Sequence, residues 1–235
     1  MGFYDNYLKR GKTTKIGKII NRINNNYYFT LIDKHLSERE SKASVLEIGP
    51  GKGFFGIACK SKGFHYTAVE ANEEIANALL QKGLNVYKKS VPPIETNQKY
   101  DIIVMNHVLE HMESRGQVFS LFENFKQILT PGGILIVTVP DITFWKADFF
   151  GSDYTHNFPF SLYSLCQVFI DSGFKVQFAG VKTLIFKGRF LANLIWCITK
   201  TSNCLGLVKL FFRSRAYKIK NLGNASCVVV GKNAK

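Results

Sequence analysis

One segment of this sequence combines an acid with three alternating glycines, a pattern that is suited to binding a ligand. Glu47 lies two residues before the first glycine, and the pattern G-x-G-x-G runs through Gly49, Gly51 and Gly53. Glycine reaches backbone angles that other residues avoid, and it lets a ligand lie directly against the main chain. The pattern therefore predicts a strand-to-helix turn that holds a nucleotide-like ligand. An acid at the strand end favours a ligand that carries a positive charge.

A second acid ends the next predicted strand. Glu70 lies 17 positions after Gly53, where a carboxylate can accept hydrogen bonds from both hydroxyls of a ribose. Dehydrogenases use an acid at a similar place, but their fingerprint G-x-G-x-x-G needs a glycine where this sequence has Phe54. Two simpler interpretations stay open, namely that the glycines form an ordinary tight turn and that Glu70 caps the following helix.

Another polar group follows the apolar segment 101–105. Asn106 and His107 come at the strand end, where open α/β sheets bind ligands. His107, Glu110 and His111 have the spacing of one helical face, which would make half of a metal site. Because the sequence shows no further ligand cluster beside them, we expect no metal. We expect Glu110 and His111 to shape the pocket or to pack structurally.

Alternating strands and helices must position these residues. Strands are predicted at 45–48, 66–70, 86–88, 101–105, 134–139, 174–181 and 225–231, and helices at 53–62, 72–82, 116–129 and 162–171. This alternation predicts a parallel sheet with helices on both faces. An N-terminal helix that packs beside the sheet or caps the pocket is predicted from apolar residues at helical spacing: Ile16, Ile19, Ile20, Ile23, Tyr27 and Leu31.

The motifs together resemble those of class I S-adenosylmethionine (SAM)-dependent methyltransferases over roughly residues 40–180. The glycine turn, the acid within Thr67–Asn72, the stretch Tyr100–Met112 and the Pro-Gly-Gly turn within Leu129–Val137 follow the family's order. The resemblance implies an α/β, Rossmann-like, doubly wound sheet of seven mostly parallel strands with an antiparallel last strand. An N-terminal helix and a helical insertion before the last strand complete the expected fold.

The same resemblance implies SAM as the cofactor. The implied cofactor-binding residues are Glu47, Gly49, Gly51, Gly53, Glu70, Ala71, Ser90, Asn106 and His107. Ser90 stands where many relatives carry an acid that contacts the adenine, so a serine oxygen or a backbone group would have to serve here.

The loop after the fifth predicted strand holds the candidate base. His156 lies within Asp153–Ser161, and a pair like Thr155-His156 recurs in relatives that act on small molecules, glycans and quinones. A neutral imidazole near pH 7 is suited to take the proton of an acceptor hydroxyl. We therefore expect His156 to act as general base, with His111 as a second catalytic candidate. The alternative is that His156 only bonds loop backbone and lines the pocket.

The composition of the chain indicates which classes of partner and which cellular location to expect. The net charge of +14 favours anionic partners such as nucleic acid, anionic lipid or acidic glycans, or else reflects a solvated basic surface. Five scattered cysteines without a C-x-x-C pair favour reduced thiols over disulfides or a zinc site. No signal-peptide core or bilayer-spanning apolar run is visible. We expect a cytoplasmic protein, with peripheral contact at the inner membrane face as a further expectation.

The sequence divides into four predicted regions: an N-terminal helical cap at 1–40, a SAM-binding core at 41–183, a basic amphipathic insertion at 184–220 and the last core strand at 221–235. Apolar aromatics with a basic rim make 186–217 a candidate contact for an anionic membrane, a cover over the acceptor pocket or a dimer face.

We therefore expect methyl transfer to a small or lipid-linked acceptor. A hydroxyl of a sugar or glycan intermediate ranks first and a quinone or phenol precursor second. The alternatives are an RNA methyltransferase, which the charge motivates, and a non-catalytic SAM-binding or membrane-surface module. Nucleic acid ranks lower because no known RNA-binding module is visible.

Overall fold

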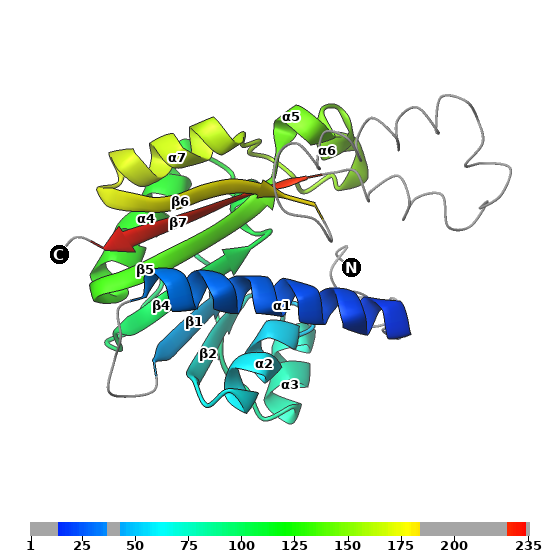
Figure 1. Cartoon of the computed structure of the whole chain (residues 1–235), viewed down its shortest axis with the longest axis vertical. Helices are drawn as coiled ribbons and strands as arrows, with labels where there is room; N and C mark the ends of the chain where they lie inside the picture. The colour runs from blue at the N-terminus through cyan, green and yellow to red at the C-terminus, as the bar shows by residue number, and fades with distance from the viewer. Residues whose placement is uncertain (1–13, 37–42, 184–224, 234–235) are drawn as a thin grey trace, which may run out of the picture.

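The computed structural model describes residues 14–36, 43–183 and 225–233 of the chain. Within these residues one sheet has the strand order β3-β2-β1-β4-β5-β7-β6 (Figure 1). Its strands are β1 Ser44–Ile48, β2 His65–Glu70, β3 Asn85–Lys88, β4 Tyr100–Asn106, β5 Leu129–Pro140, β6 Phe174–Lys182 and β7 Ser226–Asn233. Neighbouring strands from β3 to β5 pair in parallel, and β7 pairs antiparallel with both β5 and β6. The predicted Rossmann-like sheet with an antiparallel last strand is confirmed.

Helices cover both faces of the sheet. They are α1 Lys15–His35, α2 Phe54–Ser61, α3 Glu73–Gln81, α4 Arg115–Ile128, α5 Ile142–Trp145, α6 Asp148–Ser152 and α7 Leu162–Asp171. Buried residues of α1, α2 and α3 pack on one face, and those of α4 and α7 pack on the other (Figure 1). Because the central strands are covered on both sides, they read as continuous apolar runs in the sequence.

Two elements differ from the prediction around the fifth strand. β5 begins five residues earlier than expected, because the chain already pairs at Leu129 with Tyr100 before the Pro-Gly-Gly turn. The register then shifts, so that Ile134 pairs with Ile102 and the turn forms a bulge. The short helices α5 and α6 were not predicted, since four or five residues are too few to show a helical period.

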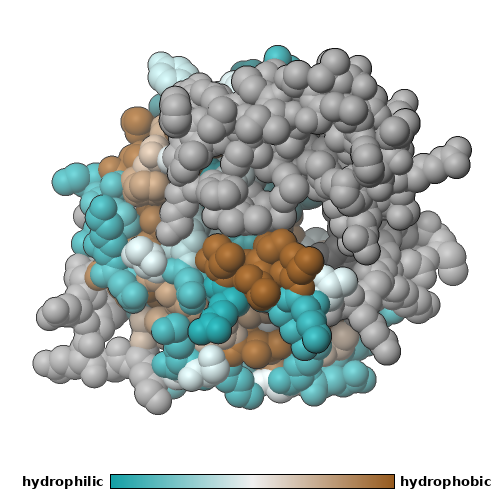
Figure 2. Space-filling view, turned by 45° about the vertical axis from the view of Figure 1, so that its right-hand side comes forward, coloured by the Kyte–Doolittle hydropathy of each residue, from teal (hydrophilic) through white to brown (hydrophobic). Residues whose placement is uncertain are grey.

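The N-terminal helix is confirmed, but its predicted apolar face is wrong at the first turns. Ile16 and Ile19 are 70% and 59% exposed, whereas the second half of α1 buries Tyr27, Tyr28 and Phe29. The first half extends beyond the ends of the strands in Figure 1 and has no sheet surface to cover. Figure 2, which turns this side forward, shows an apolar patch with polar residues below it.

Three predicted segments lie outside the described residues: the insertion at 184–220, the candidate membrane segment 186–217 within it, and the first 13 residues of the N-terminal cap. Among the helices that are described, none combines the length and the apolar character needed to cross a bilayer.

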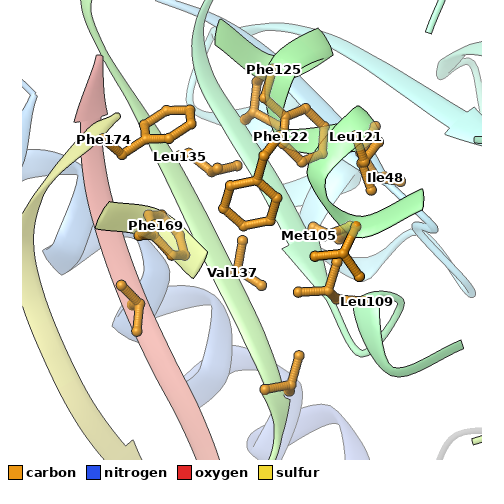
Figure 3. Packing of buried hydrophobic residues seen from close by; sticks show 14 of the residues in the cluster. Ile48, Met105, Leu109, Leu121, Phe122, Phe125, Leu135, Val137, Phe169 and Phe174 are labelled. Carbon is orange, nitrogen blue, oxygen red and sulfur yellow. The ribbon is translucent and has the colours of Figure 1, made fainter. Parts of the chain in front are cut away.

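Aromatic rings join α4, α7 and β6 in the core (Figure 3). Phe122 is fully buried and meets Phe169 and Phe174 edge to face, with ring centroids 5.0 Å and 5.9 Å away. This cluster anchors the antiparallel end of the sheet to the parallel part.

Replacing Phe122 with alanine is expected to lower the free energy of unfolding by about 3–5 kcal/mol, because a buried ring leaves a cavity. Phe119 lies on the same helix but is 38% exposed. Phe119→Ala is therefore the matched control and should cost no more than about 1 kcal/mol. Equilibrium unfolding in urea measures both, and similar losses in the two variants would contradict this account of the core.

Candidate active site

A cavity of about 1220 Å³ opens at the carboxyl ends of β1, β2 and β4. The strand order reverses beside β1, which lies between β2 and β4, and open parallel sheets bind their ligands at such a switch point. The volume exceeds the roughly 300–1,000 Å³ of a typical small-molecule pocket, so it has room for two ligands side by side. The glycine turn and the end of β2 line one part, and the loops after β4 and β5 line another.

The three glycines of the turn all have positive φ, at +65°, +52° and +74°. A Cβ added to Gly49 would lie 2.4 Å from a methyl group of Val108, so glycine is needed there for space as well as for conformation. Gly49 and Gly51 line the cavity. Gly53 does not line it: it precedes α2, and an added Cβ would lie 2.4 Å from Leu79 of α3.

Glu47 and Glu70 are buried at the cofactor end of the cavity. Burial raises the pKa of Glu47 to about 7, although the Tyr66 hydroxyl donates a hydrogen bond to its carboxylate and opposes the rise. Burial also raises the pKa of Glu70, against the backbone N–H of Asn72, which donates to Glu70 Oε1 at 2.9 Å. In the described chain neither carboxylate forms an ion pair, so both suit a ligand that brings charge or hydroxyl groups.

Of the four remaining residues that were predicted to bind the cofactor, three line the cavity and one does not. Ala71, Asn106 and His107 line the cavity, whereas Ser90 is exposed and lies outside its lining. The neighbours of Ser90, Lys89 and Val91, do line it. Ser90 lies in the loop after β3, which ends at Lys88, so its side-chain direction is not set by a strand.

The predicted single helical face of His107, Glu110 and His111 is wrong in its geometry. A 3-10 turn at Leu109–His111 follows His107, whose φ is +56°. His107 Nδ1 lies 3.2 Å from Glu110 Oε1, and its backbone N–H donates to the carbonyl oxygen of Thr138 at 2.8 Å. The turn aims Glu110 and His111 toward the loop that carries His156.

His156 and His111 meet across this junction, with ring centroids 5.1 Å apart. His156 Nδ1 lies 2.7 Å from the carbonyl oxygen of Phe149, and His111 Nδ1 lies 3.1 Å from that of Thr155. Both histidines line the cavity, so the structure brings the two predicted catalytic residues together. The backbone N–H groups of Asn157 and Phe158 both donate to the Glu110 carbonyl at 2.9 Å, which holds the two loops in place.

Sequence reasoning missed a buried lysine beside the cavity. Lys182 ends β6 and is 9% exposed, with its Nζ 3.3 Å from Asn24 Oδ1 and 4.8 Å from the centre of the Tyr28 ring. Burial lowers the pKa of Lys182 to about 8. The Tyr28 hydroxyl donates to Asn106 Oδ1 at 2.7 Å, so α1 is bonded to the end of β4.

The sequence carries a signal for some of the cavity residues that were not predicted, but not for Lys182. Nothing marks Lys182 among 31 lysine and arginine residues. The asparagines at 21, 24 and 25 were a usable signal, since amides interrupt the apolar face of a helix that was expected to cap the pocket; all three line the cavity.

Comparisons with known proteins agree with this geometry. A family model described as "Methyltransferase domain" matches residues 20–177. The chain is 31% identical over 138 residues to a ubiquinone biosynthesis O-methyltransferase of Rickettsia typhi, covering 56% of this chain and 54% of the relative. The corresponding protein of Rickettsia prowazekii is 31% identical over 141 residues, covering 57% and 54%. The chain thus spans about half the length of these curated relatives.

Two solved structures show the same fold at low identity. The crystal structure of a SAM-dependent methyltransferase from Archaeoglobus fulgidus superposes with a TM-score of 0.60 at 17% identity, covering 98% of each chain. The N-methyltransferase NodS from Bradyrhizobium japonicum, in complex with S-adenosyl-l-homocysteine, superposes with a TM-score of 0.63 at 13% identity and covers 99% of this chain and 98% of its own.

Replacing Glu47 with glutamine is expected to stabilise the ligand-free protein at pH 8 but not at pH 5. The folded pKa of about 7 exceeds the unfolded value of 4.5, so the folded state binds more protons between these values. Wild-type stability should therefore fall as the pH rises from about 4.5 to about 7, by about 3 kcal/mol at most from this group, and should change little above that range. Thermal unfolding at both pH values measures the difference.

The control for that experiment is Glu123→Gln, because Glu123 is exposed on α4. Its stability should follow that of the wild type at both pH values. A Glu47→Gln variant that is no more stable than wild type at pH 8 would show that Glu47 is not held as a buried, costly charge.

Proposed function

We propose a function for this chain from one premise, which is that it belongs to the class I SAM-dependent methyltransferase family. The proposed reaction is the methylation of a hydroxyl group of a small aromatic acceptor. The observation that carries the proposal is that one cavity joins the acid-and-glycine turn to the histidine pair. The first part fits the cofactor, and the second offers groups that can receive a proton.

The cofactor end fits SAM by its chemistry. Bound SAM supplies an electrophilic methyl carbon on a positively charged sulfur. Glu47 would hold the positively charged amino group, and Glu70 would accept hydrogen bonds from the ribose hydroxyls. Gly49 and Gly51 leave bare backbone along the same wall of the cavity. Two buried carboxylates without an ion pair among the described residues match a ligand of this charge.

The acceptor end supports transfer to oxygen. A hydroxyl must lose its proton to become a good nucleophile, and an imidazole is suited to receive it. The carbonyl oxygen at His156 Nδ1 can only accept, so Nδ1 carries the proton and the lone pair lies on Nε2. His156 therefore remains the candidate base, and His111 lies beside it. The alternative role for His156, which is to line the pocket, uses the same hydrogen bond.

An aromatic acceptor is favoured over the sugar or glycan intermediate that ranked first from the sequence. The cavity wall includes Tyr28, Phe55 and Trp145, and Lys182 brings a buried positive charge that suits a phenol as it loses its proton. The curated relatives are named for ubiquinone biosynthesis, which also supports a quinone or phenol precursor as acceptor.

Location and membrane contact form a separate part of the proposal. The net charge of +14 and the basic, aromatic segment 186–217 support a cytoplasmic protein that contacts anionic lipid. This segment lies outside the described residues.

A panel of labelled transfer reactions tests the acceptor class. With labelled SAM, simple phenols and prenylated phenols should become methylated on oxygen, and sugars should not. His156→Ala should lower turnover on the phenols by about 10²–10⁴-fold, the usual worth of a positioned base, while SAM still binds. Labelled sugars with unlabelled phenols would overturn the acceptor class, and unchanged turnover of His156→Ala would remove His156 from the mechanism.

SAM affinity should fall as the pH drops below 7. Glu47, with a pKa of about 7, must be ionised to attract the positive ligand. Affinity at pH 6 should therefore be roughly tenfold weaker than at pH 7.5, which isothermal titration calorimetry can measure. Glu47→Gln should bind weakly and with little difference between the two pH values. If the variant kept the wild-type pH dependence, another group would be responsible.

A further inference from the structure

A buried lysine lies in the wall of the cavity without a counter-ion among the described residues. Lys182 is only 9% exposed, and no described carboxylate forms an ion pair with it. We infer that Lys182, together with the side-chain amide of Asn24, binds a carboxylate group on the methyl acceptor. The acceptor is then an aromatic hydroxy acid, in which a hydroxyl is methylated and a separate acid group anchors the ring. The inference rests on the proposed function and deepens it.

Within the described chain, the Lys182 ammonium contacts only neutral groups. Two of its three N–H groups point to acceptors, which are Asn24 Oδ1 at 3.3 Å and the Tyr28 hydroxyl oxygen at 3.5 Å. Both distances exceed the roughly 2.7–3.2 Å of a good N–H···O hydrogen bond. A buried charge without an opposite charge is costly. An anion that enters the cavity beside Lys182 would reduce that cost.

Aromatic rings hold the ammonium in position. Lys182 Nζ lies 4.8 Å from the centre of the Tyr28 ring and 5.4 Å from that of Tyr27, and both contacts favour its charged form. The Tyr28 hydroxyl is itself held, because it lies 2.7 Å from Asn106 Oδ1 and 3.0 Å from Thr138 Oγ1. The positive charge is therefore placed before a ligand arrives, which reduces the entropy that binding would cost.

The amide of Asn24 offers further donors at the same place. Its Oδ1 accepts from Lys182, and its two Nδ2 N–H groups bond to no described residue. A carboxylate can accept hydrogen bonds from an ammonium and an amide at the same time. Asn25 differs from Asn24, since its Nδ2 donates to the Phe54 carbonyl oxygen at 3.1 Å and so supports the packing of α1 on α2.

A carboxylate fits this charge better than the reacting oxygen does. The acceptor hydroxyl is neutral before its proton leaves and its oxygen is neutral again after methylation, so a lysine that served it alone would lack an anion in both states. A carboxyl group has an ordinary pKa of about 4 and stays ionised at pH 7 throughout the reaction. Burial lowers the pKa of Lys182 only to about 8, so the ammonium is also charged at that pH.

The place of Lys182 in the sheet separates it from the two cofactor acids. Glu47 lies on β1 and Glu70 ends β2, whereas Lys182 ends β6, and β4, β5 and β7 lie between β1 and β6 (Figure 1). Glu70 raises the pKa of Glu47, but Lys182 changes the pKa of neither acid, although its side chain reaches Tyr28. The carboxylate of SAM is attached to the same carbon as the amino group that Glu47 would hold. We therefore assign the anion beside Lys182 to the acceptor.

A comparison of charged and neutral acceptors tests the inference. With labelled SAM, at least one of ortho-, meta- and para-hydroxybenzoate should be methylated with a kcat/KM at least about tenfold above that of its methyl ester and of phenol, because a hydrogen bond to a charged group contributes about that much. The ester keeps the shape of the acid but not its charge. Lys182→Met should reduce this preference for the acid to within about twofold, mainly by raising KM.

Matched variants separate a binding role from a damaged fold. Lys175→Met removes an exposed lysine from the same strand and should keep the wild-type preference. Asn24→Ala should reduce the preference by about fivefold, the value of one hydrogen bond, whereas Asn26→Ala on the exposed side of α1 should not. Thermal unfolding and SAM binding report on the fold, and Lys182→Met should be at least as stable as the wild type because it removes a buried charge.

Two results would overturn the inference while phenols are still methylated. Equal losses of kcat/KM on acid and phenol in Lys182→Met would show that Lys182 serves the reacting oxygen. A loss of SAM affinity as large as the loss on the acid would show that it serves the cofactor. If the wild type methylates phenols without any preference for the acids, the inference fails and the proposed function stands.

Binding separates this inference from the function on which it rests. If neither phenols nor hydroxybenzoates are methylated, the proposed function fails, and calorimetry on protein loaded with S-adenosylhomocysteine still tests the subsite. One of the three hydroxybenzoates should then bind the wild type at least about tenfold more tightly than it binds Lys182→Met. Equal binding to both proteins, or no binding to the wild type, would overturn the inference as well.

Discussion

The burial of ionisable groups around one cavity is the constraint on which the rest of this structure depends. Glu47, Glu70, Glu110 and Lys182 are all buried and all line this cavity. Among the described residues, none of the four forms an ion pair with an oppositely charged lysine, arginine, aspartate or glutamate. Glu110 contacts His107 instead. Such groups lower stability in the ligand-free protein. They are tolerated because a large apolar core on both faces of the sheet offsets that cost.

The sheet also decides where these charges meet. Glu70 ends β2 and Glu47 lies one residue before the end of β1, and the two parallel strands are adjacent, with Glu47 opposite Ala68. β4 delivers Asn106 and the turn with Glu110 to the same edge. One half of the cavity is thus built from strand ends, which are rigid. The other half comes from loops and from α1, which Tyr28 ties to Asn106 and, at 3.0 Å, to Thr138 Oγ1.

That division explains how far the sequence alone could be taken. The strands, the glycine turn and Glu70 were predictable, because hydrophobic period and glycine spacing are local signals. The convergence of Glu110, His111 and His156 was not, since it depends on a 3-10 turn and on how two loops pack. Ser90 was misplaced because spacing gives the loop but not the direction of its side chains. Lys182 carries no local signal, and only the fold reveals that a common surface residue is buried here.

The position of β7 has a consequence for how the protein is made. β7 lies between β5 and β6 and supplies the hydrogen-bond partners of both. β6 ends at Lys182 and β7 begins at Ser226. The ribosome must therefore add the residues between them before β7 can pair with β6 and with the free edge of β5. At synthesis rates of about 5–20 residues per second, this interval lasts roughly 2–9 s. During that time one edge of β5 and the whole of β6 are unpaired, and a chaperone that shields strand edges would have its main opportunity then.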